Sequence, residues 1–193
     1  MNLKVNEIFY SLQGEGARTG EPSVFIRLAG CNLDCNFCDT DYSSGSIMSV
    51  GEILNKINAF GCNRIIWTGG EPTLQLTDEI VSFFKEKGYW QAIETNGTYR
   101  VPSGIDYIAC SPKEDFETIR ERIPEVNELR FPMQAGDPLP DISLLPKAEK
   151  YLLSPVFNGN ILVPENVAYC IELIKAHPTW GLSLQIHKLI GIR

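Results

Sequence analysis

The sequence predicts an α/β fold in which mostly parallel strands form one curved, incomplete barrel. Apolar runs that suit strands alternate with amphipathic segments that suit helices, and this order gives a parallel sheet with right-handed crossovers. A closed eight-fold barrel typically needs about 250 residues. The chain has only 193 residues. We therefore predict an open, partial TIM-type barrel that forms a single domain over residues 1–193.

The strands are predicted from apolar patterning. Residues 5–12 alternate loosely between apolar and polar and are interpreted as a strand or a hairpin arm. Residues 24–30 are almost continuously apolar and end in glycine, which is typical of a buried parallel strand. Residues 43–49 are small and polar, and a loop is expected there. Further strands are expected at residues 64–69, 89–94, 105–110, 126–131, 150–155 and 182–187.

Helix start and stop signals separate these strands. Ser49 followed by Glu52 matches a capping box, and Gly61 is expected to stop the helix that follows. Thr77 is expected to cap the next helix, which ends at Gly88. Further helices are expected at residues 115–122 and from residue 164, with irregular chain at residues 132–146.

Composition excludes several classes of function. The formal net charge of -7 argues against nonspecific nucleic-acid binding, which needs a basic surface. No apolar run approaches the ~20 residues that cross a bilayer, and the first residues do not resemble a signal peptide. Six cysteines in a chain of this size do not make a disulfide scaffold. We therefore expect a cytoplasmic protein without nucleic-acid or membrane partners.

A loop with three closely spaced cysteines follows the second predicted strand. Cys31, Cys35 and Cys38 have the spacing C-x₃-C-x₂-C. Thiolates are soft ligands that select zinc, copper(I) or iron–sulfur clusters. A closed zinc site and an ordinary [4Fe–4S] cluster each take four protein ligands. Three cysteines on a four-iron cluster leave one iron open to a substrate or cofactor, and the spacing favours this interpretation.

Two other interpretations of these cysteines stay open. A structural zinc site could take a distant fourth ligand such as His177 or His187. A disulfide with one remaining thiol is less favoured, because no secretory signal opens the chain. The remaining cysteines, Cys62, Cys110 and Cys170, are interpreted as small buried apolar residues.

Arg27 interrupts the apolar run of residues 24–30. An arginine in a buried strand must be paired or must face a polar cavity. Arg27 could therefore form a structural ion pair, or it could bind a carboxylate bidentately.

The predicted topology brings several loops together. In α/β folds the site lies at the carboxyl ends of the parallel strands. The loops that leave those ends should therefore share one cavity, and they comprise residues 31–40, 68–72, 94–97, 111–113 and 154–155.

The cysteine loop, with an aromatic residue just before its last cysteine, resembles the cluster loop of the radical S-adenosylmethionine (SAM) enzymes. Gly69-Gly70-Glu71-Pro72, after a predicted strand, resembles the glycine-rich element of the same superfamily. Bare glycine backbone can pair with the amino group of SAM without obstruction by a side chain. The resemblance covers most of the chain and implies a radical SAM core.

A narrower resemblance extends to segments outside these two motifs. They are residues 11–16, Arg27, residues 38–40, 94–97 and 111–113, and residues 185–188 near the C-terminus. Together they resemble the 7-carboxy-7-deazaguanine synthases, a family of radical SAM lyases in queuosine and 7-deazapurine biosynthesis. The resemblance implies conversion of 6-carboxy-5,6,7,8-tetrahydropterin to 7-carboxy-7-deazaguanine with loss of ammonia. It also implies a [4Fe–4S] cluster, SAM, Mg²⁺, an electron donor such as flavodoxin or ferredoxin, and usually a homodimer.

The same resemblance implies roles for individual residues. The chemistry is expected to be carried by a radical derived from SAM, with no catalytic side chain. Cys31, Cys35 and Cys38 would ligate the cluster, and the hard hydroxyl oxygen of Thr40 would ligate Mg²⁺. SAM contacts are implied for Phe37, Cys38, Asp39, Gly70, Ser111, Pro112 and Lys113. Substrate contacts are implied for Leu12, Gln13, Gly14, Arg27 and Thr68, with Arg27 on the pterin carboxylate.

Three further residues have open roles. Ser154 departs from the Gln-Pro that the family often shows at this place. Glu94 and His187 could each be a structural group or a ligand contact.

Two rival functions stay open at this point. A glycyl-radical-enzyme activase has the same cluster spacing, but it acts on a protein and needs a surface for its partner's glycine loop. A non-catalytic iron–sulfur or zinc module would be recognised by metal analysis, with one zinc and no sulfide in the zinc case.

Overall fold

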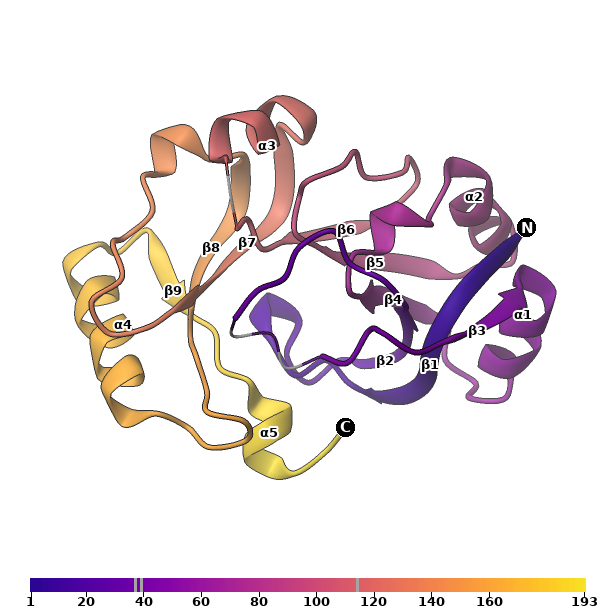
Figure 1. Ribbon diagram of the computed structural model, residues 1–193, viewed down its shortest axis with the longest axis horizontal. Helices are drawn as coiled ribbons and strands as arrows, with labels where there is room; N and C mark the ends of the chain where they lie inside the picture. Colours follow the sequence, from indigo (N-terminus) through magenta and orange to yellow (C-terminus); the bar gives the residue numbers. More distant parts are fainter. Residues whose placement is uncertain (37, 39, 114) are drawn as a thin grey trace.

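The computed structural model describes residues 1–36, 38, 40–113 and 115–193, and the strands within these ranges form one nine-stranded sheet (Figure 1). Its strand order is β3-β1-β2-β4-β5-β6-β7-β8-β9. The strands are β1 Asn2–Leu12, β2 Pro22–Leu28, β3 Ser46–Ser49, β4 Arg64–Gly69, β5 Trp90–Thr95, β6 Tyr107–Cys110, β7 Glu125–Met133, β8 Lys147–Pro155 and β9 Trp180–Leu182.

The sheet is mostly parallel and is not closed. β1 lies antiparallel to β2 and β3, whereas the pairs from β2–β4 to β8–β9 are all parallel. β3 and β9 are the two edges of the sheet. Figure 1 shows the sheet bending around a central space, with α1 to α4 on its outer side. The partial barrel predicted from the sequence is confirmed.

The first two helices begin where the sequence supplies caps. Glu52 N donates to Ser49 Oγ at 3.2 Å, and Ser49 N donates to Glu52 Oε2 at 2.7 Å, so the predicted capping box is present. Thr77 Oγ1 accepts from Ile80 N at 3.4 Å at the start of the second helix. The helices are α1 Val50–Asn58, α2 Asp78–Glu86, α3 Phe116–Arg122, α4 Pro164–Ala176 and α5 Ile186–Ile190, with short 3₁₀ turns at Gly16–Arg18, Pro72–Leu74 and Ile142–Leu144.

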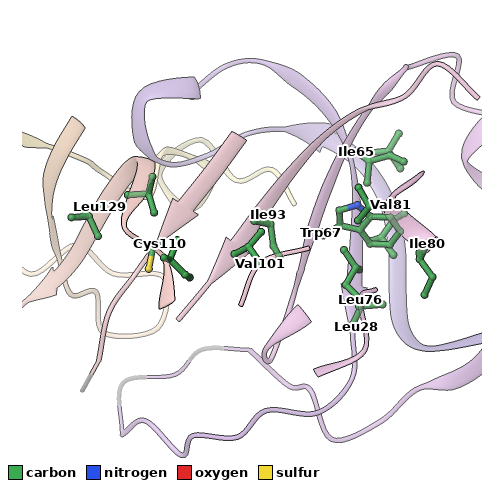
Figure 2. Close-up of a cluster of buried hydrophobic side chains, with 14 of the residues drawn as sticks. Leu28, Ile65, Trp67, Leu76, Ile80, Val81, Ile93, Val101, Cys110 and Leu129 are labelled. Carbon is green, nitrogen blue, oxygen red and sulfur yellow. The ribbon is translucent and has the colours of Figure 1, made fainter. Parts of the chain in front are cut away.

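The hydrophobic core lies between the sheet and the outer helices. Trp67 on β4 packs edge-on against Phe84 on α2, with ring centroids 5.3 Å apart. The indole N–H of Trp67 donates to Gln91 Oε1 at 2.9 Å, so this buried polar group is satisfied. Figure 2 shows the cluster running from Leu28, Ile65 and Trp67 on one side to Ile93, Cys110 and Leu129 on the other.

Strand alternation directs polar side chains to the opposite, concave face. On β2, Ile26 and Leu28 are fully buried in the core, whereas Phe25 and Arg27 line a cavity. On β7, Leu129 is in the core and Arg130 lines the cavities. The same alternation that builds the core therefore supplies the wall of the site.

The loop predicted at residues 43–49 is wrong in its second half. Ser46–Ser49 is β3, which pairs with the start of β1 from Asn2↔Ser49 to Val5↔Ser46. β3 is an edge strand, and its Ile47 is 67% exposed. Backbone pairing with β1 creates this strand, because no buried face marks it in the sequence.

The strand predicted at residues 182–187 is also wrong. β9 ends at Leu182, and Ile186–Ile190 forms α5, so His187 lies on a helix. Ser183 N donates the last bond of this ladder to Leu153 O at 2.9 Å. The next partner on β8 is Pro155, which has no N–H to continue the ladder.

Among the residues that the structure describes, none of the helices has the length and apolar character needed to span a membrane.

Candidate active site

Two adjoining cavities lie at the carboxyl ends of the parallel strands. The larger has a volume of about 490 Å³ and the smaller about 200 Å³. Glu15 and Arg130 line both. The larger cavity draws on each of the strand-end loops predicted to converge, through Cys31, Cys35, Cys38, Gly69, Gly70, Asn96, Ser111, Lys113, Ser154 and Pro155.

The three cysteines of the loop line the larger cavity together. Cys38 N donates to Cys35 O at 2.9 Å, which turns the chain between these two cysteines. Leu33 N donates to Cys31 Sγ at 3.5 Å. At the base of the loop, Gly30 N donates to Tyr42 O at 2.9 Å. The backbone thus brings three thiols to the wall of one cavity.

Gly70 lies directly against the cysteine loop. A Cβ at Gly70 would lie 2.1 Å from Gly30 O and 2.7 Å from Cys31 Cβ, so a larger residue would displace the loop. The next residue, Glu71, is fully buried, and its N–H donates to Gly30 O at 2.9 Å. Its carboxylate accepts from Asn96 N at 2.7 Å. The Gly-Gly-Glu segment therefore connects the cysteine loop to the end of β5.

Ser111 and Lys113 form a second wall of the larger cavity. Ser111 Oγ donates to Arg130 O at 2.7 Å, and Lys113 Nζ donates to Ser111 Oγ at 2.5 Å. Burial lowers the pKa of Lys113 to about 8, against the opposing effect of Cys35. Pro112 is buried between them and does not line the cavity.

All five residues predicted to contact substrate line the smaller cavity, and Thr40 lines it too. They are Leu12, Gln13, Gly14, Arg27 and Thr68. Gly14 O accepts from Ile186 N at 2.8 Å, and a Cβ at Gly14 would lie 2.2 Å from His187 Nδ1. Glycine is required here because α5 packs directly on the loop after β1.

Arg27 forms the structural ion pair that was one of its two interpretations, and it also lines a cavity. Arg27 Nε pairs with Glu7 Oε1 at 2.8 Å, and Arg193 pairs with the other oxygen of Glu7. The Arg27 side chain also lines the smaller cavity. A guanidinium has five N–H donors, so the ion pair leaves donors for a ligand.

Glu94 lies in the smaller cavity within a group of charges. It accepts from Gln13 Nε2 at 3.0 Å and pairs with Arg130. Burial raises the pKa of Glu94 to about 7. Arg130 opposes this rise, whereas Glu128 and Glu15 add to it. Glu94 therefore holds its proton to a higher pH than an ordinary carboxyl group does.

The remaining predicted residues have mixed outcomes. Phe37 and Asp39 lie outside the described residues. Ser154 lines the larger cavity and His187 the smaller, whereas His177 lines neither. Cys110 and Cys170 are buried as expected, and Cys62 is half-buried.

The sequence interpretation missed Arg130 and Glu128, and it named Glu15 and Asn96 only as members of segments, without a role of their own. Arg130, Glu15 and Asn96 line the larger cavity, and Glu128 is buried. A signal for Arg130 was present, because it interrupts the apolar stretch Leu129-Arg130-Phe131 as Arg27 interrupts its own strand. Glu15 and Asn96 lie in turns, where polar residues are common and carry no such signal.

The donor set fits an iron–sulfur cluster with one open iron. Across the described residues, no three His, Cys, Asp or Glu side chains form a group that could hold a single metal ion. Thiols that bind separate corners of a cluster do not need to meet at one point. Three thiols on the wall of a cavity of about 490 Å³, beside the bare backbone of Gly70, leave space for a cluster and a bound SAM.

The fold and the site define a class of protein. The model of the family described as "Radical SAM superfamily" matches residues 25–176. The chain belongs to this superfamily.

Full-length relatives narrow the family. A 7-carboxy-7-deazaguanine synthase of Bacteroides thetaiotaomicron is 42% identical over 193 residues, covering 100% of both chains. One from Haemophilus influenzae is 45% identical over 199 residues, covering 99% of this chain and 94% of the relative. The crystal structure of QueE from Escherichia coli matches with a TM-score of 0.73 and 26% identity, covering 97% of this chain and 95% of that one. Within the superfamily, the chain belongs to the 7-carboxy-7-deazaguanine synthases.

Proposed function

We propose that this chain converts 6-carboxy-5,6,7,8-tetrahydropterin to 7-carboxy-7-deazaguanine with release of ammonia, using the larger cavity for the cluster and SAM and the smaller for the pterin. One observation carries the proposal. All the residues implied as substrate contacts line a separate cavity of about 200 Å³ that shares Glu15 and Arg130 with the cysteine-lined cavity. A substrate in the smaller cavity is thus next to whatever fills the larger one.

The charges of the smaller cavity support a carboxylate substrate. Arg27 and Thr40 line the same space. In this proposal Arg27 binds the pterin carboxylate, and Thr40 helps to hold a Mg²⁺ ion that also takes substrate oxygens. Gln13 and Glu94, joined at 3.0 Å, offer an amide and a carboxyl group for the polar edge of the pterin ring.

The larger cavity supports a cluster held by Cys31, Cys35 and Cys38, with SAM held along Gly70, Ser111 and Lys113. When bound, these groups supply the radical chemistry of the superfamily. The protein's own part is to orient the two ligands and to keep water away from them. Phe37 and Asp39 stay in the proposal as SAM contacts on the strength of the sequence resemblance alone.

Partners follow from the same chemistry. The cluster needs a reductant, and we include a flavodoxin or ferredoxin as the donor. Cys38 is exposed, which supports access for such a donor.

A homodimer is also part of the proposal, and the exposed side chains of Leu189 and Ile190 on α5, at 45% and 57%, offer an apolar surface for it. The cytoplasm is the proposed location, because it keeps thiols reduced.

Anaerobic reconstitution tests the proposal directly. Iron and sulfide are restored to the protein, and carboxypterin, SAM and a reductant are added with and without Mg²⁺. The expected product is the deazaguanine chromophore, formed faster with Mg²⁺. Cleavage of SAM without any deazaguanine would favour the activase instead.

Thr40→Ala should weaken the dependence of the rate on Mg²⁺ concentration. An unaltered dependence would remove Thr40 from the metal site.

A further inference from the structure

Arg130 lies in the wall between the two cavities and lines both of them. It comes from the middle of β7, and its side chain is 10% exposed. An arginine this deeply buried must be compensated by acceptors.

Three carboxylates from three different parts of the chain surround this guanidinium. Arg130 Nε lies 3.3 Å from Glu15 Oε2, in the loop after β1. Arg130 Nη1 lies 3.2 Å from Glu128 Oε1, and Nη2 pairs with Glu94 on β5. Each nitrogen of the guanidinium thus lies close to a different carboxylate, but only the contact with Glu94 is a hydrogen bond. Nη1 and Glu128 Oε1 attract each other by charge and form no hydrogen bond.

The three carboxylates are not equivalent. Glu128 is fully buried and is anchored without Arg130, because it accepts from Ala17 N at 2.8 Å and Tyr107 Oη at 3.0 Å. Glu15 lines both cavities, whereas Glu94 lines only the smaller. Glu128 therefore provides a fixed negative charge beside Arg130, and Arg130 in turn pairs with the two carboxylates that line the cavities, Glu15 and Glu94.

We infer that Arg130 is a positioning residue: it holds Glu15, which lines both cavities, and Glu94, which lines the smaller, and so fixes the position of the ligand in one cavity relative to the ligand in the other. The inference rests on the proposed function and adds a residue to it. If the pterin and SAM lie in these cavities, Glu15 and Glu94 help to place them. The distance between the reacting atoms of the two ligands then depends on the positions of these two carboxyl groups. Misplacement by a fraction of a contact distance costs rate and selectivity, because the reacting atoms must stay near van der Waals contact.

Arg130→Lys tests this inference, because it keeps the charge and removes the fork. An ammonium can pair with one carboxylate well, but it cannot hold three in fixed directions. We expect the reconstituted enzyme to release at least about tenfold more 5′-deoxyadenosine for each deazaguanine formed. The reason is that SAM would be cleaved while the pterin is not held close enough to react. The affinity for SAM, measured by equilibrium binding, should change less than about threefold. A change this small is not expected from the loss of a direct contact with SAM.

A double-mutant cycle separates positioning from general loss of structure. Pterin affinity is measured by equilibrium binding in Arg130→Lys, in Glu94→Gln and in the double variant. If Arg130 acts through Glu94, each single change weakens pterin binding by about tenfold, and the double variant is no weaker than either. Effects that multiply to about a hundredfold would mean independent roles and would overturn the inference. So would an unchanged ratio of 5′-deoxyadenosine to product in Arg130→Lys.

A second pair of variants is used if Arg130→Lys does not fold, that is, if it loses the wild-type near-UV circular dichroism. Glu15→Gln and Glu94→Gln then form the cycle, with the ratio of 5′-deoxyadenosine to product as the readout. Non-additive effects support a shared positioning residue, and additive effects overturn it. Failure of the proposed function gives a different result, namely a wild-type enzyme that forms no deazaguanine from the carboxypterin.

Discussion

Arg27 is the residue whose role can be measured most directly. If its guanidinium binds the pterin carboxylate, Arg27→Ala removes a charge-assisted contact worth about 2–5 kcal/mol. The KM for the carboxypterin should then rise by about thirtyfold or more. The dissociation constant of SAM should not change, because Arg27 lines only the smaller cavity.

Arg100→Ala is the matched control for Arg27. Arg100 also forms an ion pair, with Asp78 at 2.7 Å, but its side chain is 67% exposed. Exposed pairs contribute about 0–1 kcal/mol to stability, so this variant should keep wild-type kinetics. Equal KM values for Arg27→Ala and the wild type would leave Arg27 as a structural partner of Glu7 only.

A variant and a matched control can also distinguish the proposed cluster ligands from the other cysteines. Cys35→Ala removes one of three thiols at the larger cavity, and the reconstituted protein should lose the visible absorbance of the cluster and all turnover. Cys62→Ala is the control, since Cys62 is half-buried and lies outside both cavities. A brown, active Cys35→Ala protein would contradict the ligand assignment.

Residue-level prediction from sequence worked where a residue type conflicts with its surroundings. Three clustered cysteines and an arginine in an apolar strand are such conflicts, and all of them line the cavities. Arg130 was overlooked although it presents the same conflict. Its importance depends on Glu15 and Glu94, which are distant in sequence and meet it only in the folded chain.

At the scale of elements, the loop after β1 shows how a short turn fixes the site. Gly16 N donates to Ser183 Oγ at 2.8 Å, and Ala17 N donates to Glu128 Oε2 at 2.8 Å. The guanidinium of Arg18 stacks over the Trp90 ring at 4.2 Å from its centroid. The turn Gly16–Arg18 is thus held by the start of β5, by β7 and by the chain after β9, while Gln13 and Gly14 before it line the smaller cavity.

Two glycines near this turn give a prediction with an internal control. Gly16 has φ +71°, and a Cβ there would lie 2.1 Å from Glu128 Oε1. Gly20 has φ +91°, and a Cβ there would have nothing within 4 Å. Gly20→Ala should lower the free energy of unfolding by about 1–2 kcal/mol, the cost of the left-handed backbone. Gly16→Ala should cost about 1–3 kcal/mol more, because Glu128 must leave its partners.

Chemical denaturation under reducing conditions measures both glycine variants. Equal losses for Gly16→Ala and Gly20→Ala would show that the turn can move away from Glu128 without cost.

Element-level prediction failed where pairing, rather than local pattern, determines the structure. β3 exists because β1 offers it an edge, and β9 ends because Pro155 cannot continue the ladder. Neither fact is visible in the segment concerned. The capping box at Ser49 was predictable because both partners lie within one turn.

At the scale of the whole molecule, the convergence of loops followed from topology alone. Parallel strands place all their carboxyl ends on one side, so the order of elements was enough to predict a shared cavity. The contact between the C-terminal segment and the region of β1 was not predictable. The chain near the C-terminus reaches back to β1, with Ile186 N donating to Gly14 O at 2.8 Å and Ser11 Oγ donating to Arg193 O at 2.5 Å.

The charge group at the centre of the barrel makes the stability of the whole molecule depend on pH. Burial raises the pKa of Glu94 to about 7 from the ordinary glutamate value of 4.5, with Arg130 opposing the rise and Glu128 and Glu15 adding to it. Between pH 4.5 and 7 the folded protein therefore keeps a proton on Glu94 that the unfolded chain has released. Stability falls as pH rises wherever the folded state binds more protons, by at most about 1.4 kcal/mol per pH unit for one group.

Glu94→Gln should remove this part of the pH dependence, because glutamine does not titrate. The free energy of unfolding of the variant minus that of the wild type should increase as the pH rises from 5 toward 7, and should level off above the folded pKa of about 7. Glu117→Gln, at an exposed position on α3, should give a flat difference over the same range. A flat difference for Glu94→Gln as well would mean that Arg130 holds Glu94 ionised throughout, since only the attraction of that guanidinium can offset the cost of burying the carboxylate.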